Sequence, residues 1–110
     1  MTAQNISFHP MKRIEIIVKG EKESFVRDLL DQAEVSGYTL IRDIAGMGHH
    51  GFHEGRLLFN ETASLVLFMA VGPQSIIQSI AEGLRPIFEK NSGVMFFSTV
   101  EVVRMDYFDR

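Results

Sequence analysis

The chain has 110 residues, 45% of them hydrophobic, so it can bury one compact core and is too short for two. Its formal net charge is −3, and its 11 Lys and Arg residues are dispersed, which argues against a nucleic-acid-binding surface. It contains no cysteine, which excludes disulfides, thiolate metal ligands and thiol chemistry.

The N-terminal segment lacks the patterns of folded structure. Residues 1–10 are polar, show no periodicity and end at Pro10, so we expect a loose tail there and a single domain over residues 11–110. No basic segment followed by an apolar one is present, as a secretory signal would require. The longest apolar run, residues 65–71, is far shorter than the roughly twenty residues of a membrane-spanning helix. We therefore expect a cytoplasmic protein.

After the tail, strand patterns alternate with helix patterns. Residues 13–19 alternate β-branched apolar side chains, which predicts a strand. Residues 21–33 carry an apolar stripe with helical spacing, and Gly37 stands where a helix C-cap is expected. Residues 38–45 and 63–71 are again typical of strands.

The second half of the chain repeats the helix and strand. A second apolar helical stripe follows Pro73, and Pro86 should kink or end that helix near Leu84, with continuation of the apolar face through Ile87 and Phe88 as the alternative. Residues 93–105 form the last predicted strand, which a bulge near Ser98 and Thr99 would interrupt. The side chains expected in the core from the two helices are Phe25, Leu29, Ile76, Ile80 and Leu84.

This β-α-β-β-α-β order predicts an α+β, ferredoxin-like fold with an antiparallel sheet. Two helices can cover only one face of a four-stranded sheet, yet the strands are apolar on both faces. A monomer would expose a larger apolar patch than soluble monomers tolerate. We therefore expect a homo-oligomer with sheets inward and helices outward.

Between the second and third strands, Gly46, Gly48 and Gly51 spell G-x-G-x-x-G, a spacing that binds dinucleotides when it opens a helix. Here no helical stripe follows, so the context of that fingerprint is missing. The first two glycines have another use: they let the backbone approach a ligand, and their amides can donate to phosphate.

The same segment is rich in histidine. His49, His50 and His53, with Glu54, could bind zinc or copper, although the neighbouring glycines make the loop too flexible to hold a preformed site. The alternative is an exposed loop that happens to carry histidines. No serine or threonine is placed against a histidine and a carboxylate by a recognisable spacing, so we expect no enzyme.

Taken in order, "AGMGHHG" after the second strand and "SGVMFFSTVEVVR" at the last strand resemble the PII signal-transduction proteins, over residues 11 to about 104. Proteins of that family are trimers of ferredoxin-like subunits that bind adenine nucleotides in clefts between neighbouring subunits. The loop after their second strand, the T-loop, carries the response to partners. The resemblance implies a homotrimer with a T-loop at about residues 47–61.

The resemblance also implies a set of site residues. "GMG" at 46–48 matches the family's Gly-Phe-Gly at the T-loop root, and Gly93 matches the glycine that begins the last strand. "VEVVR" is similar to the family's Val-Glu-Glu-Val-Val-Arg, which makes Arg104 the expected phosphate contact, a task suited to a planar guanidinium. The implied nucleotide contacts are Gly46, Met47, Gly48, Ser92, Gly93, Val94 and Arg104, with His49 and Arg56 as contacts from the T-loop.

Departures from the family pattern narrow the choice of nucleotide that the chain is expected to bind. The second phosphate-binding loop of the family is shortened to "EKNSGVMFF", and Val94 stands where the family has lysine, so ADP or AMP is favoured over ATP. The T-loop contains no tyrosine, which argues against uridylylation. The chain is most similar to the PII-like proteins linked to inorganic carbon, including transporter-linked and carboxysome-associated members. That implies bicarbonate as a second ligand and a transporter or carbon-fixation component as partner.

The leading hypothesis is a non-enzymatic sensor, in which adenine nucleotide orders the T-loop and changes the surface that a partner meets. The first alternative is a metal-binding trimer resembling the CutA family, with His49, His50 and His53 as ligands. The second is a small enzyme that uses this histidine loop for acid-base chemistry, because histidine titrates near neutrality. The sequence leaves the partner and the physiological nucleotide open.

Overall fold

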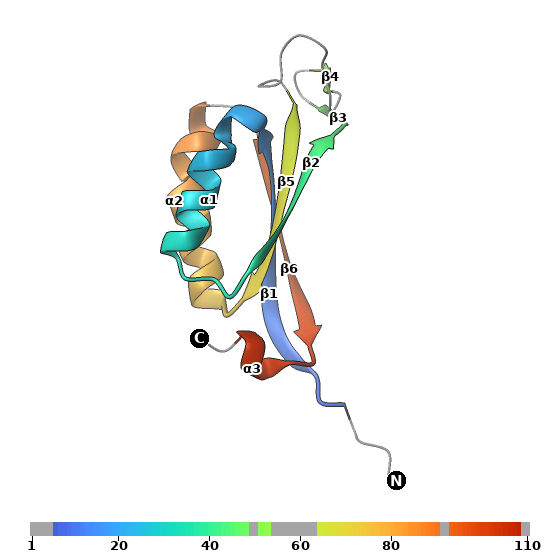
Figure 1. The fold of residues 1–110 in the computed structure, drawn as a ribbon, viewed down its shortest axis with the longest axis vertical. Helices are drawn as coiled ribbons and strands as arrows, with labels where there is room; N and C mark the ends of the chain where they lie inside the picture. The colour runs from blue at the N-terminus through green and yellow to red at the C-terminus, as the bar shows by residue number, and fades with distance from the viewer. Residues whose placement is uncertain (1–5, 49–50, 54–63, 91–92, 109–110) are drawn as a thin grey trace.

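The computed structural model describes residues 6–48, 51–53, 64–90 and 93–108 (Figure 1). In chain order the elements are β1 (His9–Lys19), the 3-10 turn η1 (Gly20–Lys22), α1 (Glu23–Gln32), β2 (Tyr38–Ile44), β3 (Gly46–Gly48), β4 (Gly51–His53), β5 (Leu65–Gly72), α2 (Gln74–Lys90), β6 (Gly93–Val102) and α3 (Met105–Phe108). No helix in the described part of the chain is long and apolar enough to cross a membrane.

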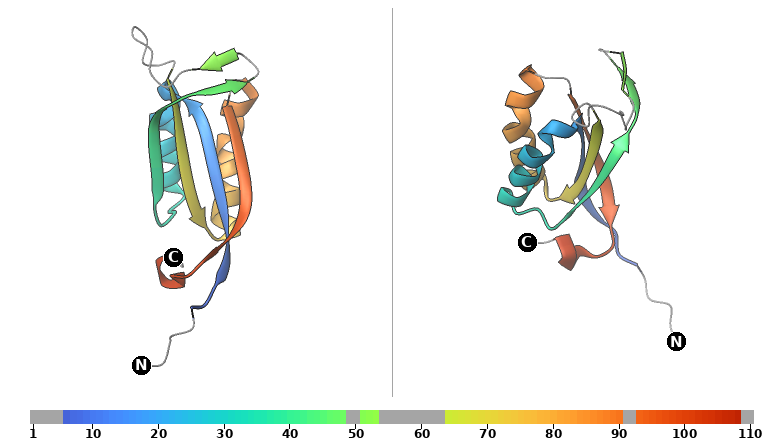
Figure 2. Two further views of the ribbon diagram at one scale, coloured as in Figure 1. Left: turned by 90° about the vertical axis from the view of Figure 1, so that its right-hand side faces the viewer. Right: turned by 45° about the horizontal axis from the view of Figure 1, so that its top comes forward.

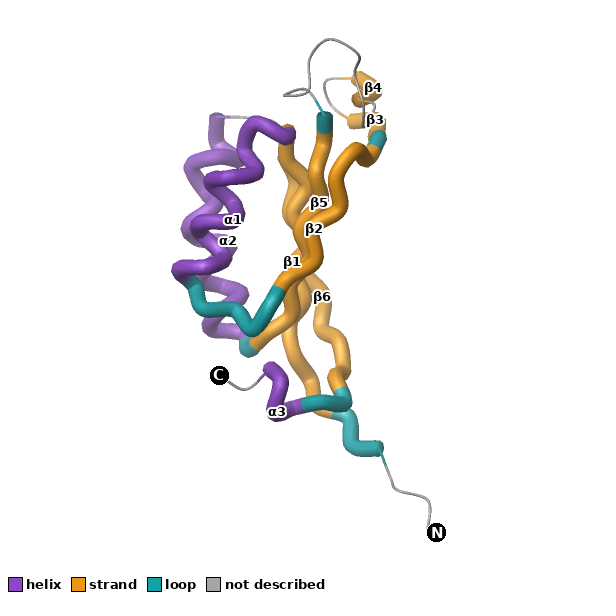
Figure 3. The backbone as a smooth tube through the Cα atoms, in the orientation of Figure 1, coloured by secondary structure: helices purple, strands orange, loops and turns teal. Residues whose placement is uncertain are grey.

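The long strands form one antiparallel sheet in the order β2-β5-β1-β6, and β3 and β4 form a separate two-stranded hairpin. Both long helices lie against the same face of the sheet, so the fold has two layers (Figures 1 and 3). This is the predicted ferredoxin-like arrangement. The strands run past the helices at the lower end, where β1 and β6 continue as a pair.

The core lies between the sheet and the helices because alternate residues of the central strands point to the helix side. On β1 and β5 these are Ile14, Ile16, Val18, Val66, Phe68 and Ala70, and all are buried. The helices contribute Val26, Leu30, Ile77, Ile80, Leu84 and Ile87 to the same cluster. The ring of Phe68 packs against Tyr38 of β2, with centroids 5.8 Å apart, which joins the edge strand to the core.

The other face of the sheet carries no helix (Figure 2). One row of apolar residues crosses this face from edge to edge. In the register of the strands, Ile41 lies beside Leu67, Leu67 beside Ile17, and Ile17 beside Val94. At the two edges, Ile41 and Val94 are 48% and 45% exposed. Phe96, in the next row on the same face, is 53% exposed. The face without helices is thus apolar along this row and on β5, but β1 also places Arg13 and Glu15 on it, so the prediction of strands apolar on both faces holds only in part.

Several predicted boundaries were wrong. β1 begins at His9 rather than near Arg13, so its first residues, within the segment expected to be a tail, pair with β6. α1 is capped at Ala33, and Glu34 takes the left-handed conformation, with φ of 62°, that was expected at Gly37. β6 pairs with β1 in an uninterrupted register, without the expected bulge.

The helix predictions need two further corrections. α2 continues through Pro86 to Lys90, because Ile87 is buried and Phe88 packs on the core beyond the proline. That packing offsets the hydrogen bond that proline cannot donate. Phe25, expected in the core, is 48% exposed, whereas Ile80 and Leu84 are fully buried and Leu29 and Ile76 are partly buried.

The contrast between two phenylalanines tests this core. We expect Phe68→Ala to lower the free energy of unfolding by about 3–5 kcal/mol, because it leaves a cavity under both helices. The matched control Phe25→Ala, at an exposed position, should cost less than about 1 kcal/mol. Urea unfolding followed by circular dichroism at one protomer concentration measures both, and equal losses would contradict the assignment of the core.

Candidate functional site

The segment predicted as the T-loop root leaves the sheet at an irregularity in β2. The pairing of β2 with β5 shifts between Arg42 and Ile44, and Asp43 between them has a φ of 59°. Such a bulge bends an edge strand and increases its twist. Beyond it, β3 extends past the end of the sheet on the side away from the helices (Figures 1 and 2). The backbone of Gly46–Gly48 is therefore presented outside the four-stranded sheet.

The glycine segment forms a hairpin rather than a loop that opens a helix. Gly46 pairs with His53, Met47 with Phe52, and Gly48 with Gly51. A helix N-terminus for a pyrophosphate is thus missing at this position, as the sequence context predicted. The short hairpin itself was not predicted, because three-residue strands rich in glycine give no periodic signal.

Part of the predicted site lies outside the described residues. That holds for His49, His50, Arg56 and Ser92, and for most of the expected T-loop at residues 47–61. His53 lies in β4, so only one histidine of the metal hypothesis is placed. Among the residues that the structure describes, no three His, Cys, Asp or Glu side chains converge as metal ligands would.

The second predicted group, Gly93 and Val94, begins β6 at the same end of the sheet as the hairpin (Figure 1). A Cβ at Gly93 would lie 2.7 Å from Cε1 of Phe88 and 3.3 Å from the carbonyl oxygen of Ile17. The close approach of α2 and β1 therefore requires glycine here, whether or not its amide meets phosphate. Val94 projects from the face without helices.

The third predicted contact, Arg104, follows β6 and is exposed. Its guanidinium lies 5.4 Å from the centroid of the Tyr107 ring, a cation-π contact, and its carbonyl oxygen accepts a hydrogen bond of 3.0 Å from the Tyr107 amide. The hydroxyl of Tyr107 lies against Gly37, where a Cβ would be only 2.8 Å away. The short α3 thus holds Arg104 next to the start of β2, an arrangement that the sequence did not reveal.

These groups do not meet within one chain. Gly93 pairs with Val18 at one end of β6, whereas Val102 pairs with His9 at the other. At about 3.3 Å per residue, the ten residues of β6 separate Gly93 from Arg104 by roughly 30 Å. Arg104 therefore lies at the opposite end of the sheet from the hairpin, and one site can contain both only across a boundary between two chains.

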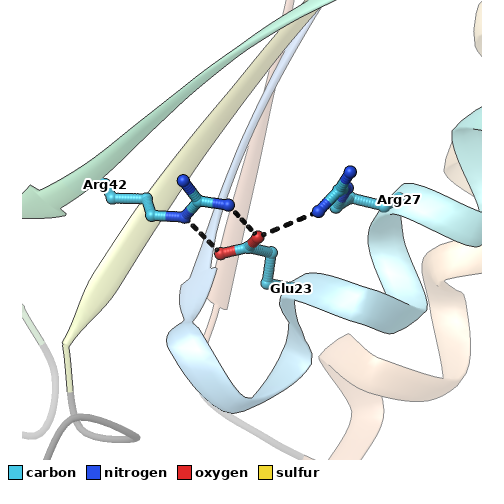
Figure 4. Close-up of polar contacts among 3 residues, drawn as sticks. All are labelled: Glu23, Arg27 and Arg42. Carbon is cyan, nitrogen blue, oxygen red and sulfur yellow. Dashed lines mark hydrogen bonds and ion pairs between the residues drawn. The ribbon is translucent and has the colours of Figure 1, made fainter.

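Sequence reasoning missed an ion-pair cluster beside the bulge (Figure 4). Arg42 donates from Nε to Oε1 of Glu23 at 2.9 Å and from Nη2 to Oε2 at 2.6 Å. Arg27 lies one turn along α1, with Nη1 3.5 Å from Oε2 of Glu23. The hydrogen bonds from Arg42 hold the pKa of the Glu23 carboxyl below its usual range. The periodicity of one helix or strand cannot reveal a contact between residues that belong to different elements.

A cavity of about 260 Å³ opens beside this cluster, lined in part by Glu21, Asp43 and Ser64. None of the described nucleotide contacts that the sequence predicted lines it. The cluster and the cavity lie next to the root of the predicted T-loop, on the helix side of β2, since Val66, which pairs with Arg42, is a core residue.

A model of the family described as Nitrogen regulatory protein P-II matches residues 11–107. No curated protein matches the chain. Among solved structures, the chain is similar to CPII, a nitrogen regulatory PII-like protein from Thiomonas intermedia K12, bound to ADP, AMP and bicarbonate. The identity is 40%, the match covers 94% of this chain and 98% of that one, and the TM-score is 0.87.

Two further structures bear on the alternatives. CPII from the same organism bound to ADP and bicarbonate is 38% identical, over 94% of this chain and 99% of that one, with a TM-score of 0.84. CutA1 from Oryza sativa is 8% identical, over 92% of this chain and 89% of that one, with a TM-score of 0.66. The likeness to CutA1 is one of fold alone and gives no support to the metal hypothesis.

The lowered pKa of Glu23 predicts a pH dependence of stability. A carboxyl whose pKa is depressed by folding stabilises the protein above its unfolded pKa, here 4.5, and that contribution is lost as the pH falls through the folded value. We expect Glu23→Gln to unfold no more than about 5 °C below wild type at pH 7, since the cations of the cluster are exposed.

Differential scanning calorimetry between pH 3 and pH 8 measures this dependence. The difference between wild type and Glu23→Gln should stay constant at neutral pH, narrow as the pH falls below 4.5, and close below the lowered pKa of the folded Glu23 carboxyl, where both carry an uncharged side chain. A difference that persists unchanged at pH 3 would show that the charge of Glu23 plays no part in it.

Proposed function

The chain belongs to the P-II family, whose members are regulatory proteins, and on that premise we propose that it is a sensor that binds adenine nucleotide between neighbouring subunits. The observation that carries this proposal is the likeness to CPII, which covers nearly the whole of both chains at 40% identity. In that structure CPII is bound to ADP, AMP and bicarbonate. At this level of likeness the ligand class of CPII is the natural expectation for this chain.

The first element of the proposal is a homotrimer with sheets inward, which is consistent with the family. The apolar row from Ile41 to Val94 crosses the whole sheet, and both of its ends are about half exposed in the single chain. Its burial against a second copy would remove this surface from water. The helices would then face outward.

The second element is a nucleotide site shared by two chains. We assign the backbone of Gly46, Met47 and Gly48, together with Ser92, Gly93 and Val94, to one side of the site. Arg104 would come from the neighbouring chain, because within its own chain it lies at the opposite end of β6. A guanidinium suits a diphosphate or monophosphate, and the absence of lysine at position 94 favours ADP or AMP over ATP.

The third element is regulation without catalysis. Nucleotide, with bicarbonate as a second ligand, would order the T-loop, and His49 and Arg56 would contact the ligands from it. A partner that prefers the ordered loop must tighten nucleotide binding by the same factor. The proposed partner is a transporter or a component of carbon fixation.

Calorimetric titration with AMP, ADP and ATP tests the ligand class. We expect ADP and AMP to bind more tightly than ATP, because a triphosphate lacks a lysine partner at position 94. Bicarbonate should tighten ADP binding, since the two ligands occupy CPII together. GDP serves as the control for the base. Absence of binding by all adenine nucleotides at millimolar concentration would exclude the proposal.

A pair of variants tests the shared site. Arg104→Ala should weaken ADP binding at least about tenfold through the loss of a charge-assisted contact, while the exposed Arg85→Ala on α2 serves as the matched control. Gly48→Glu should also abolish binding, by placing a carboxylate at the phosphate.

Mixing the two defective variants then separates shared from single-chain sites. In trimers reassembled from equal amounts of Arg104→Ala and Gly48→Glu, about one site in four would combine an intact root with an intact arginine from the neighbour. Recovery of that fraction of ADP binding is expected. No recovery, although the mixed trimers form, would place both residues in the same half of the site and contradict the assignment.

A further inference from the structure

We propose that Glu23 and Arg42 form a positioning pair that fixes the direction in which the T-loop root, Gly46–Gly48, leaves the sheet, so that Glu23 controls nucleotide affinity without touching the nucleotide. The effect on affinity rests on the function proposed above, whereas the effect on the root does not. Three features set this direction: the geometry of the pair, its anchors in α1 and β2, and the bulge between the pair and the glycines.

The pair joins the start of α1 to the end of β2. One guanidinium occupies both carboxylate oxygens, at 2.9 Å and 2.6 Å, and such two-point contacts fix orientation as well as distance. Glu23 is the first residue of α1, and Arg42 stands near the end of the edge strand β2. The pair thus links the helix layer to the strand from which the root departs (Figure 4).

The helix side of this link is rigid. Val26 and Leu30, one and two turns after Glu23, are fully buried in the core, so the first turn of α1 is held in place by packing. A carboxylate is also favourable in the first turn because of the helix dipole. Glu23 can therefore act as a fixed point for Arg42.

The strand side needs such a fixed point. Arg42 is the last residue of β2 before the register shift, and Asp43 then takes the left-handed conformation, which costs an L-residue energy unless its surroundings hold it. As an edge strand, β2 pairs only with β5. The cavity of about 260 Å³ beside the pair leaves space into which the bulge could move. The direction of the root therefore depends on Arg42.

The exposure of Arg42 indicates that the pair positions more than it stabilises. The side chain of Arg42 is 58% exposed and that of Glu23 is 18% exposed, and ion pairs open to water on one side contribute little to the free energy of unfolding. The other charged groups around it are Arg27, Glu21 and Asp43. Arg27 contacts the same carboxylate at 3.5 Å from α1, and its polar neighbour on β2 is Tyr38, at the opposite end of that strand from the bulge, so it provides a matched control.

The first measurement is amide hydrogen exchange at residues 45–48 in the nucleotide-free protein. Glu23→Gln should exchange several times faster there than wild type, and Arg27→Ala should match wild type. The double variant Glu23→Arg with Arg42→Glu should recover slower exchange than either single change. Equal exchange in wild type and Glu23→Gln would overturn the proposal, independently of whether any nucleotide binds.

The second measurement is ADP affinity by calorimetry. Glu23→Gln should bind ADP about 3–30 times more weakly, the range found for positions that act on a site indirectly, with the trimer intact. Arg27→Ala should bind as wild type does. If wild type binds ADP and Glu23→Gln binds it equally well, the positioning role is excluded while the proposed function stands. A loss of affinity that occurs only together with loss of the trimer would also exclude it.

Discussion

The structure depends on one geometric constraint, which is that two helices cover only one face of a four-stranded sheet. The face without helices carries an apolar row through Leu67 and Ile17 that runs from one edge strand to the other, beside the charged Arg13 and Glu15 of β1. Water would have to solvate that row in an isolated chain, so the hydrophobic effect favours association through the sheet. The absence of a third layer is therefore the physical basis of the oligomer expected for this family.

The same constraint decides where a ligand can bind. The helix side of the sheet is filled by core side chains, whereas the hairpin at Gly46–Gly48 and Val94 near the start of β6 lie toward the open face. Arg104 lies at the far end of that sheet, held by Tyr107. A ligand that contacts residues of both groups must bridge two chains, and its binding then also stabilises the assembly. Association and ligand binding are thus linked by the topology.

The sequence was sufficient for the fold because the β-branched alternation and the two helical stripes are local signals. The sequence was also sufficient to indicate the family, because its glycines at the predicted T-loop root and at the last strand occur in the same order as in the P-II pattern. Prediction from the sequence failed where tertiary contacts override local preference. Packing of Ile87 beyond Pro86 keeps α2 intact, and Glu34 takes the left-handed conformation that was expected at Gly37. The Glu23–Arg42 pair joins residues far apart in sequence, which periodicity cannot detect.

A loop that responds to a ligand places two opposed demands on its root. The loop must not be stable before the ligand binds, since a small ligand can shift only a small free-energy difference. The root must nevertheless point at the ligand, because contacts to phosphate depend on direction. An exposed ion pair next to a bulge meets both demands, because it fixes geometry while it adds little stability. Burial of the same segment in the core would satisfy only the second, so a switch of the kind proposed favours a positioning pair outside the core, where Glu23 and Arg42 lie.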